Sequence, residues 1–200
     1  MLGRKQSIAH EAFAEAMARC LPKARRGMPE PKQNKHRSKQ DYVTPWEFVR
    51  AVEARWGPLD VDLAASDANA RAPDYFTEED DTFKQNWDRL ASMICWLNCE
   101  FGDIERYAAK CARHAPAFRA AGGRILLFTP ASIGSEWFRD HVYGKALVLS
   151  VGPRVQFEGA PDPYPKDLML SVFGEDPGFD VWRWKAPRTK KTKPAQVPMA

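Results

Sequence analysis

The sequence predicts an α/β fold built on a mostly parallel, doubly wound sheet. Across residues 45–151, short apolar runs typical of buried strands alternate with amphipathic segments at helical spacing. This alternation is the pattern of parallel strands joined by crossover helices. Two further apolar runs, 154–157 and 168–173, follow without a helix between them and indicate a C-terminal antiparallel hairpin. The composition, 44% hydrophobic and 28% charged, lies in the globular range and is sufficient for one packed core.

The first helix of this fold is expected to begin after Thr44. Thr44 fits the N-cap, Pro45 the first helical position and Glu47 the third, and together they form a capping box. Gly57 fits the residue that ends the helix. The apolar side chains at helical spacing between these ends are Phe48, Val49, Val52 and Trp56.

Two expected strands carry polar side chains at their carboxyl ends. Residues 59–64 alternate apolar with acidic side chains and place Asp62 just before a run of small residues. A long acidic loop without clear periodicity follows at 71–87, and the continuous apolar run 94–97 is typical of a buried strand that ends at Asn98. Because ligands of open α/β sheets bind outside the carboxyl ends of the strands, Asp62 and Asn98 are expected at the binding edge.

The remaining elements continue the alternation. Asp103 fits the N-cap of a long amphipathic helix, which the pair Gly122 and Gly123 ends. The later expected elements are the strand 124–129, the short helix 135–142 and the strand 146–151, before the closing hairpin.

The net charge of +4 is unevenly distributed along the chain. Residues 1–40 hold ten Lys and Arg against three Glu, a net of +7, while residues 183–200 hold six and no acid, and the part between them carries −9. Such terminal blocks are typical of arms that contact polyanions, although a solubilising tail has the same composition. The sequence therefore predicts a basic arm with a short helix and a disordered linker at 1–40, a folded domain at 41–182 and a disordered basic tail at 183–200.

Several classes of protein do not fit the sequence. No run approaches the roughly 20 apolar residues of a membrane span, and no apolar region follows the basic N-terminal residues as in a secretory signal. A cytoplasmic protein without membrane contact is therefore expected. The four cysteines form no Cys-x-x-Cys pair and have no histidine at zinc-finger spacing, so no metal site is expected.

An ordered set of short motifs runs through the expected domain. They are Tyr-x-Thr-Pro at 42–45, Asp-Leu-Ala-Ala-Ser at 62–66, Tyr-Phe-Thr-Glu-Glu-Asp-Asp at 75–81, Trp-Leu-Asn-x-x-Phe at 96–101, Thr-Pro-Ala at 129–131, Trp-Phe at 137–138 and Arg-Val-Gln-Phe-Glu-Gly at 154–159. In this order they resemble the phage-type DNA N6-adenine methyltransferases, the Dam-like family of bacterial viruses and prophages. The resemblance covers roughly residues 41–174. It implies a Rossmann-like methyltransferase fold, S-adenosylmethionine as methyl donor and adenine in double-stranded DNA as acceptor, with the protein in the cytoplasm of a bacterial host cell.

The resemblance also assigns residues to the donor. Thr44 and Pro45 match the segment that lines the methionine part of the donor, and a capping box explains the same two residues equally well. Asp62, beside the small Ala64, would accept hydrogen bonds from the ribose hydroxyls or the ammonium group, and a solvent-facing strand carboxylate is the alternative. Asp81 matches the position that meets the adenine of the donor, within an acidic run that leaves the register open.

The expected target-base site departs from the family pattern. Family members carry Asn-Pro-Pro followed by Tyr or Phe, and this chain reads Asn98-Cys99-Glu100-Phe101. In that motif the Asn carboxamide oxygen and a backbone carbonyl accept hydrogens from the exocyclic amine of a flipped-out adenine, and the aromatic ring stacks on the base. Cys99 and Glu100 remove the rigidity of the two prolines.

Three hypotheses about function follow from this motif. The first is an adenine-N6 methyltransferase in which Asn98 and Phe101 hold the base. The second is a catalytically impaired relative that acts as a DNA-binding protein. The third is methylation of another amine or of RNA. A remoter option makes Cys99 a covalent nucleophile, which requires a thiol of low pKa.

Overall fold

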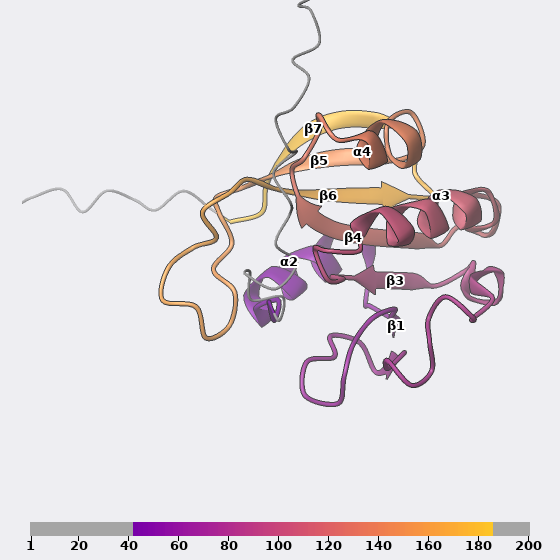
Figure 1. Cartoon of the computed structure of the whole chain (residues 1–200), viewed down its shortest axis with the longest axis horizontal. Coiled ribbons are helices and arrows are strands. Elements are labelled where there is room, and N and C mark those ends of the chain that lie inside the picture. The colour runs from indigo at the N-terminus through magenta and orange to yellow at the C-terminus, as the bar shows by residue number, and fades with distance from the viewer. Residues whose placement is uncertain (1–41, 186–200) are drawn as a thin grey trace, which may run out of the picture. The chain divides into compact units, whose positions relative to one another are not determined.

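The computed structural model describes residues 42–185 and contains four helical segments and seven strands in that part of the chain (Figure 1). The helical segments are α2 (Trp46–Trp56), the 3-10 turn η1 (Trp87–Leu90), α3 (Ile104–Ala121) and α4 (Glu136–His141). The strands are β1 (Val61–Asp62), β2 (Asp74–Tyr75), β3 (Ile94–Leu97), β4 (Arg124–Pro130), β5 (Leu147–Gly152), β6 (Leu168–Phe173) and β7 (Gly178–Arg183). The predictions made for residues 1–40 and for 186–200 lie outside the described residues.

The seven strands form one sheet in the order β2-β1-β3-β4-β6-β5-β7. Strands β2, β1, β3 and β4 are parallel to one another, and β5 and β7 run in the same direction. Within this sheet β6 alone is antiparallel, and it lies between β4 and β5. The prediction of a mixed α/β fold with a mostly parallel sheet is therefore confirmed, and the carboxyl ends of six strands meet at one edge.

The predicted hairpin between residues 154–157 and 168–173 is wrong. The partners of β6 are β4 and β5, and residues 154–157 belong to the long connection 153–167. Val155 and Phe157 are apolar because they are buried in the core beneath this connection, with 0% and 2% of their surface exposed. A loop that buries two side chains has the same short apolar pattern as a strand. The sequence pattern therefore could not distinguish a buried loop from a strand at 154–157.

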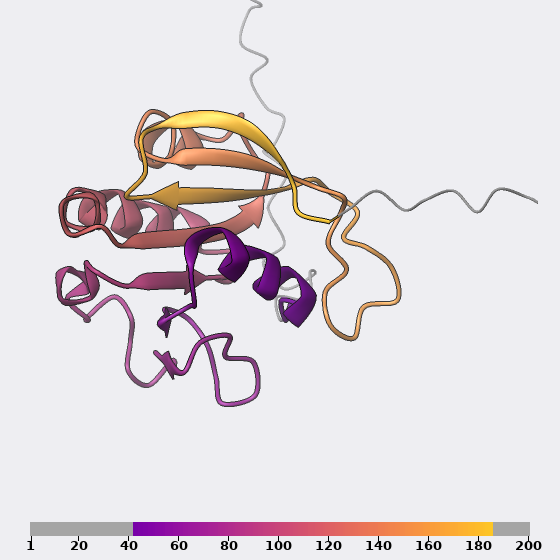
Figure 2. The ribbon, with the colours of Figure 1, turned by 180° about the vertical axis from the view of Figure 1, so that it is seen from behind.

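Helices cover both faces of the sheet. α2 lies on one face, and α3 and α4 lie on the other (Figures 1 and 2). A hydrophobic core lies on each face of the sheet. The central strand β4 contributes side chains to both cores, because successive side chains of a strand point to opposite faces. Ile125 and Leu127 belong to the core beneath α3, whereas Leu126 and Phe128 belong to the core beneath α2, and all four are fully buried.

The strand β7 extends the folded part to the end of the described residues. The predicted domain boundary between 182 and 183 falls inside this strand, which ends at Arg183. Trp182 and Trp184 both pack against the ring of Phe48 on α2, at centroid distances of 5.6 and 5.1 Å. The sequence did not predict β7, because Phe179 and Val181 are exposed on this edge strand and no buried run marks it.

The predicted capping box at the start of α2 is wrong. Pro45 occupies the N-cap and no side chain caps the helix. The hydroxyl of Thr44 instead lies 3.1 Å from the amide nitrogen of Asn98, and Glu47 forms an ion pair with Lys185 at 2.6 Å. The Thr44 side chain is therefore directed toward the residue that follows β3.

Candidate functional site

A hydrogen-bond network joins three of the predicted site residues at the carboxyl edge of the sheet. Asn98 follows β3, and its Nδ2 donates to the carbonyl of Tyr42 at 2.6 Å and to Oγ1 of Thr44 at 3.1 Å. Nε of Arg71 donates to the carbonyl of Thr44 at 2.6 Å. The backbone N–H of Arg71 in turn donates to Oδ2 of Asp62 at 3.0 Å. Asn98, Thr44 and Asp62 are thus connected through Arg71 and Tyr42.

The Asn98 amide has one free acceptor. Because a carbonyl can only accept, the NH2 group of Asn98 must face Tyr42, and Oδ1 is directed elsewhere. Oδ1 is buried and has no hydrogen-bond partner among the described residues. An unpaired buried acceptor costs about 1–3 kcal/mol, and a ligand that donates a hydrogen to Oδ1 would remove this cost.

Four aromatic side chains lie together at Tyr42, the residue whose carbonyl accepts a hydrogen bond from Asn98. The ring of Tyr42 stacks with Phe101 at a centroid distance of 5.5 Å and an interplanar angle of 22°. It also contacts the rings of Phe157 at 5.0 Å and Tyr164 at 5.3 Å. We call these four residues the aromatic cluster. The structure therefore gives Phe101 two ring contacts, to Tyr42 and to Tyr164 at 5.9 Å, with residues that were not assigned to the site from the sequence.

Asp62 is buried and supports a loop. Only 3% of its surface is exposed, its Oδ1 accepts the N–H of Ala64 at 3.3 Å, and Oδ2 accepts the N–H of Arg71. Burial raises the pKa of the Asp62 carboxyl to about 7, against the opposing effect of these two N–H groups and of the Arg71 charge. The carboxylate thus fixes the shape of residues 62–71, and its direct contact with a donor stays a prediction.

Arg71 is a residue of the network that sequence reasoning missed. Besides its bond to Thr44, its Nη2 pairs with Oε2 of Glu158 at 2.8 Å, and its guanidinium lies 4.8 Å from the ring centre of Trp46. The N–H of Glu158 also donates to the carbonyl of Val43 at 2.9 Å. Arg71 therefore fastens the loop after β1 to the start of α2 and to the connection 153–167. The sequence signal was an arginine at the start of a loop whose charged residues are mostly acidic.

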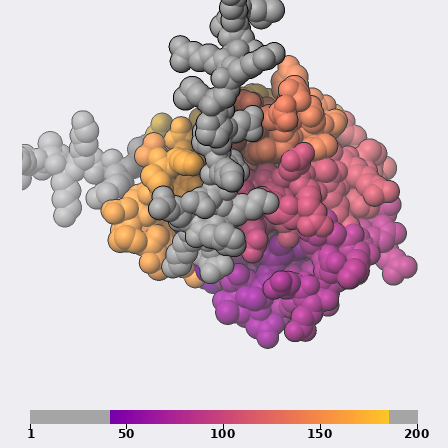
Figure 3. All heavy atoms as spheres, viewed as in Figure 1, coloured from indigo at the N-terminus to yellow at the C-terminus, as the bar shows by residue number. Residues whose placement is uncertain are grey.

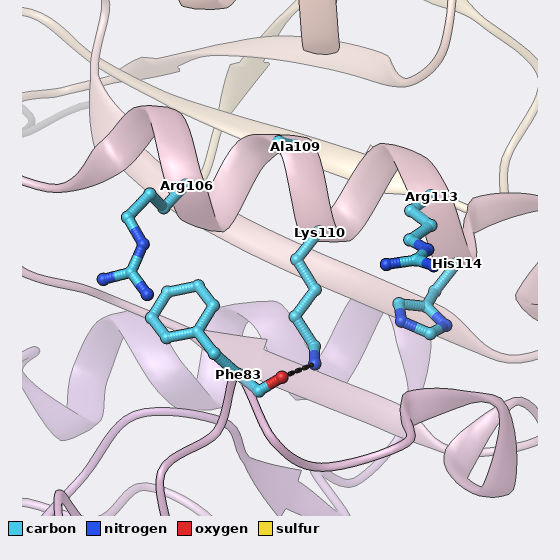
Figure 4. A pocket seen from close by; sticks show the side chains of 6 residues that line it. All are labelled: Phe83, Arg106, Ala109, Lys110, Arg113 and His114. Atoms are coloured by element: carbon cyan, nitrogen blue, oxygen red, sulfur yellow. Dashed lines mark hydrogen bonds between the residues drawn. The ribbon is translucent and has the colours of Figure 1, made fainter.

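Asp81 lies two residues before Phe83, which with Arg106 and Lys110 lines a separate hollow against α3 (Figure 4). Its backbone has a φ of 48°, and its carboxylate accepts the N–H of Phe83 at 3.1 Å and pairs with Lys84, which lowers the pKa of Asp81. Arg106 lies over the ring of Phe83 at 3.9 Å, and Lys110 donates to the Phe83 carbonyl at 3.0 Å. No hydrogen bond among the described residues joins Asp81 to the Asn98 network.

Cys99 lacks the two properties of a nucleophilic cysteine, which are an accessible side chain and a thiol of low pKa. Only 4% of its surface is exposed, it packs in the core beneath α3 with Ala108 and Cys111, and burial raises the pKa of its thiol. The next residue, Glu100, is exposed, and its carbonyl accepts the N–H of Asp103 at 3.1 Å. Packing and a turn therefore anchor the two positions where family members carry proline.

Neither a metal centre nor a membrane helix is found in the described part of the chain. Residues 42–185 contain no group of three or more His, Cys, Asp or Glu side chains placed to hold a metal ion. No helix in the same range is long and apolar enough to cross a bilayer.

The fold and site fit the class of S-adenosylmethionine-dependent methyltransferases, with polar groups at the carboxyl ends of adjacent parallel strands. Residues 32–166 match the family described as DNA N-6-adenine-methyltransferase (Dam), and the chain belongs to this family. It is also 23% identical over 108 residues to the DNA N-6-adenine-methyltransferase of Escherichia phage T1. That match covers 54% of this chain and 43% of the phage protein, less than half its length. The resemblance to phage-type adenine methyltransferases is confirmed.

Proposed function

We propose that this protein transfers a methyl group from S-adenosylmethionine to N6 of adenine at specific sites in double-stranded DNA, in the cytoplasm of a bacterial host. The observation that carries the proposal is the buried, unpaired Oδ1 of Asn98 at the carboxyl end of β3. The exocyclic amine of adenine has two hydrogens, and Oδ1 of Asn98 can accept one of them. Membership of the Dam family supports the choice of adenine.

Asn98 positions the amine through an amide that is itself held. Two bonds fix the NH2 group, to the Tyr42 carbonyl and to Thr44 Oγ1, so Oδ1 has a defined direction. Accepting a hydrogen from N6 orients the amine and increases the electron density on its nitrogen. Phe101 and its partners in the aromatic cluster provide ring faces against which a flipped-out base stacks. Because Oδ1 is buried, side chains around it move when the base enters.

The chain's residues also fit the donor, which supplies a methyl group on a cationic sulfonium. Asp62 holds the loop after β1, and the small side chain of Ala64 leaves space beside it. We assign the methionine part to the start of α2 at Thr44 and Pro45, because Thr44 also contacts Asn98 and the donor must lie next to the base. Asp81 and its neighbouring ring are assigned to the adenine of the donor. The net acidic body of the chain suits a cationic ligand.

Turnover is retained in this proposal despite the altered motif. The two prolines of the family motif act by fixing the backbone after the Asn, and here burial of Cys99 and the turn from Glu100 to Asp103 restrict the same segment. The Asn98 amide is held by Tyr42 and Thr44, neither of which depends on proline. The alternative of an impaired DNA-binding relative gains no support from the family match or the phage relative.

The test is transfer of label from methyl-labelled S-adenosylmethionine to unmethylated double-stranded DNA, with identification of the modified base. Wild type is expected to label adenine at N6, and Asn98→Ala to lose at least about 100-fold in rate while still binding the donor in calorimetry. Asn86→Ala is the matched control, since Asn86 caps η1 at the opposite edge of the sheet. Label on another base, no label with wild type, or full activity in Asn98→Ala would each contradict the proposal.

A further inference from the structure

A second cavity lies beside the Asn98 site and has no role in the function proposed so far. Its volume is about 840 Å³, and it is bounded by the start of α2, the connection 153–167 and the end of β7. The connection projects from the carboxyl edge of the sheet as a long loop (Figures 1 and 3). We call this cavity the lateral groove. The lining residues used here are Arg154, Phe157, Glu158, Arg183, Trp184 and Lys185.

The lateral groove is continuous with the site of the target base. Phe157 lines the groove and also packs on Tyr42, whose carbonyl holds the Asn98 amide. Glu158 lines the groove and binds the backbone of Val43. Phe157 and Tyr42 therefore stand between a molecule in the groove and Asn98.

The free charge of the groove is positive. Two acids line it, and both are neutralised: Glu47 by Lys185, and Glu158 by Arg71. Arg183 forms no ion pair with any residue that the structure describes. Arg154 has Asp167 at 3.5 Å, but both side chains are more than half exposed, so water screens this pair. Two arginines from different segments thus remain available to a polyanion.

The walls of the groove are held in place by their own hydrogen bonds. Nε2 of Gln156 donates to the carbonyls of Ala160 at 2.9 Å and Pro161 at 3.2 Å, which closes the turn of the connection. Nε1 of Trp184 donates to the carbonyl of Pro153 at 2.6 Å. These bonds hold the backbone next to Arg154 and Arg183 before any ligand arrives, which reduces the ordering cost of binding.

We infer that the lateral groove holds the sugar–phosphate backbone of the DNA strand next to the adenine that enters the Asn98 site, with Arg154 and Arg183 on its phosphates. Arginine suits this role because its planar guanidinium matches phosphate geometry. The chain continues from Lys185 into residues 186–200, which by sequence hold four Lys or Arg and no acid. The inference rests on the proposed function, since it takes the partner to be DNA.

The test measures affinity for duplex DNA against salt concentration, by fluorescence anisotropy, with the full chain. Each phosphate contact contributes about 0.9 to the slope of log K on log salt, so Arg154→Gln/Arg183→Gln is expected to reduce the slope by about 1.8 and the affinity by about tenfold or more. The control is Arg89→Gln/Lys145→Gln. Arg89 and Lys145 precede β3 and β5, so they lie at the opposite edge of the sheet, and this pair is expected to keep the wild-type slope.

The possible results separate this inference from the proposed function. An unchanged slope in Arg154→Gln/Arg183→Gln, or an equal loss in both double variants, would overturn the groove assignment even while wild type methylates adenine. A wild type that neither binds DNA nor labels it would overturn both. Thermal unfolding of both double variants identifies any loss of fold, and single Arg183→Gln, at an exposed side chain, then repeats the measurement with an expected slope change of about 0.9.

Discussion

Thr44 contacts two partners of the site through two different atoms. Its hydroxyl meets the Asn98 amide, while its carbonyl accepts from Arg71. A side-chain substitution therefore removes the first contact and leaves the second in place. This separation makes Thr44 a probe of how far the rate depends on the orientation of the Asn98 amide.

Thr44→Val is expected to lower the rate of methyl transfer about fivefold, because it preserves the shape of a buried residue and removes a hydrogen bond worth about 1 kcal/mol. Thr44→Ser keeps the hydroxyl and is expected to keep most of the rate. Single-turnover kinetics with labelled donor measures both. Equal rates for the Val and Ser variants would show that the hydroxyl does not orient Asn98.

Asp62 gives the stability of the protein a pH dependence of defined sign. The pKa of the Asp62 carboxyl is about 7 in the folded chain and about 3.9 in the unfolded chain. Between these two pH values the carboxyl is mostly protonated in the folded state and mostly ionised in the unfolded state. Stability from this group is therefore present at low pH and lost as pH rises toward 7.

Asp62→Asn is expected to remove this dependence. The difference in unfolding free energy between wild type and the variant should fall by about 1.4 kcal/mol for each unit between pH 5 and pH 7, and then level off. Urea unfolding at several pH values measures it. A difference that stays constant across this range would mean that Asp62 is ionised throughout.

The turn from α3 into β4 is the tightest junction between elements. A Cβ at Gly123 would lie 2.3 Å from the carbonyl oxygen of Ala91 and 2.5 Å from that of Met93, both backbone atoms. Gly123→Ala is therefore expected to destabilise the protein by about 1–3 kcal/mol in urea unfolding. Gly178→Ala on β7 is the matched control, since its Cβ would meet only a side-chain atom of Leu147 at 3.4 Å. Similar stability of the two variants would contradict this account.

Long elements were predicted from sequence more closely than short ones. α3 and β4 repeat a clear apolar pattern over many residues, and their predicted and observed bounds agree within a few positions. β1 contains only two residues, and β7 exposes its apolar side chains, so neither has a strong pattern of its own. The capping box failed because Thr44 has a partner distant in sequence, and local spacing carries no information about such a partner.

The same limit applies to the site. The order of the sheet brings the ends of neighbouring parallel strands together, which is why Asp62 and Asn98 were predicted at one edge. Arg71, Tyr42 and Tyr164 were not assigned, because their roles depend on contacts between segments that are separated by up to about 120 residues in the sequence. Sequence reasoning therefore identified the groups at the strand ends and missed the residues that hold them.

In the whole molecule, the basic ends are expected to add affinity for DNA, whereas the folded part alone is expected to bind S-adenosylmethionine. A chain without residues 1–40 and 186–200 is expected to bind DNA more weakly and with a smaller salt slope, while its affinity for S-adenosylmethionine is unchanged. The C-terminal cut is placed at 186 because β7 ends at Arg183 and Trp184 packs on Phe48. Anisotropy and calorimetry measure the two affinities. An equal loss of both would argue against separate roles.

The position of β6 has a consequence for the synthesis of the protein. β4 and β5 do not pair with each other, and β6, which follows both in the sequence, is the strand that joins them. Until residues 168–173 leave the ribosome, the growing chain can form only the partial sheet β2-β1-β3-β4, with an unpaired edge at β4. β5 then has no partner strand, because β7 also follows β6 in the sequence. Such edges pair readily with other chains. The nascent protein is therefore most exposed to aggregation late in translation, and a chain that stops before residue 168 leaves the edge of β4 and the whole of β5 unpaired.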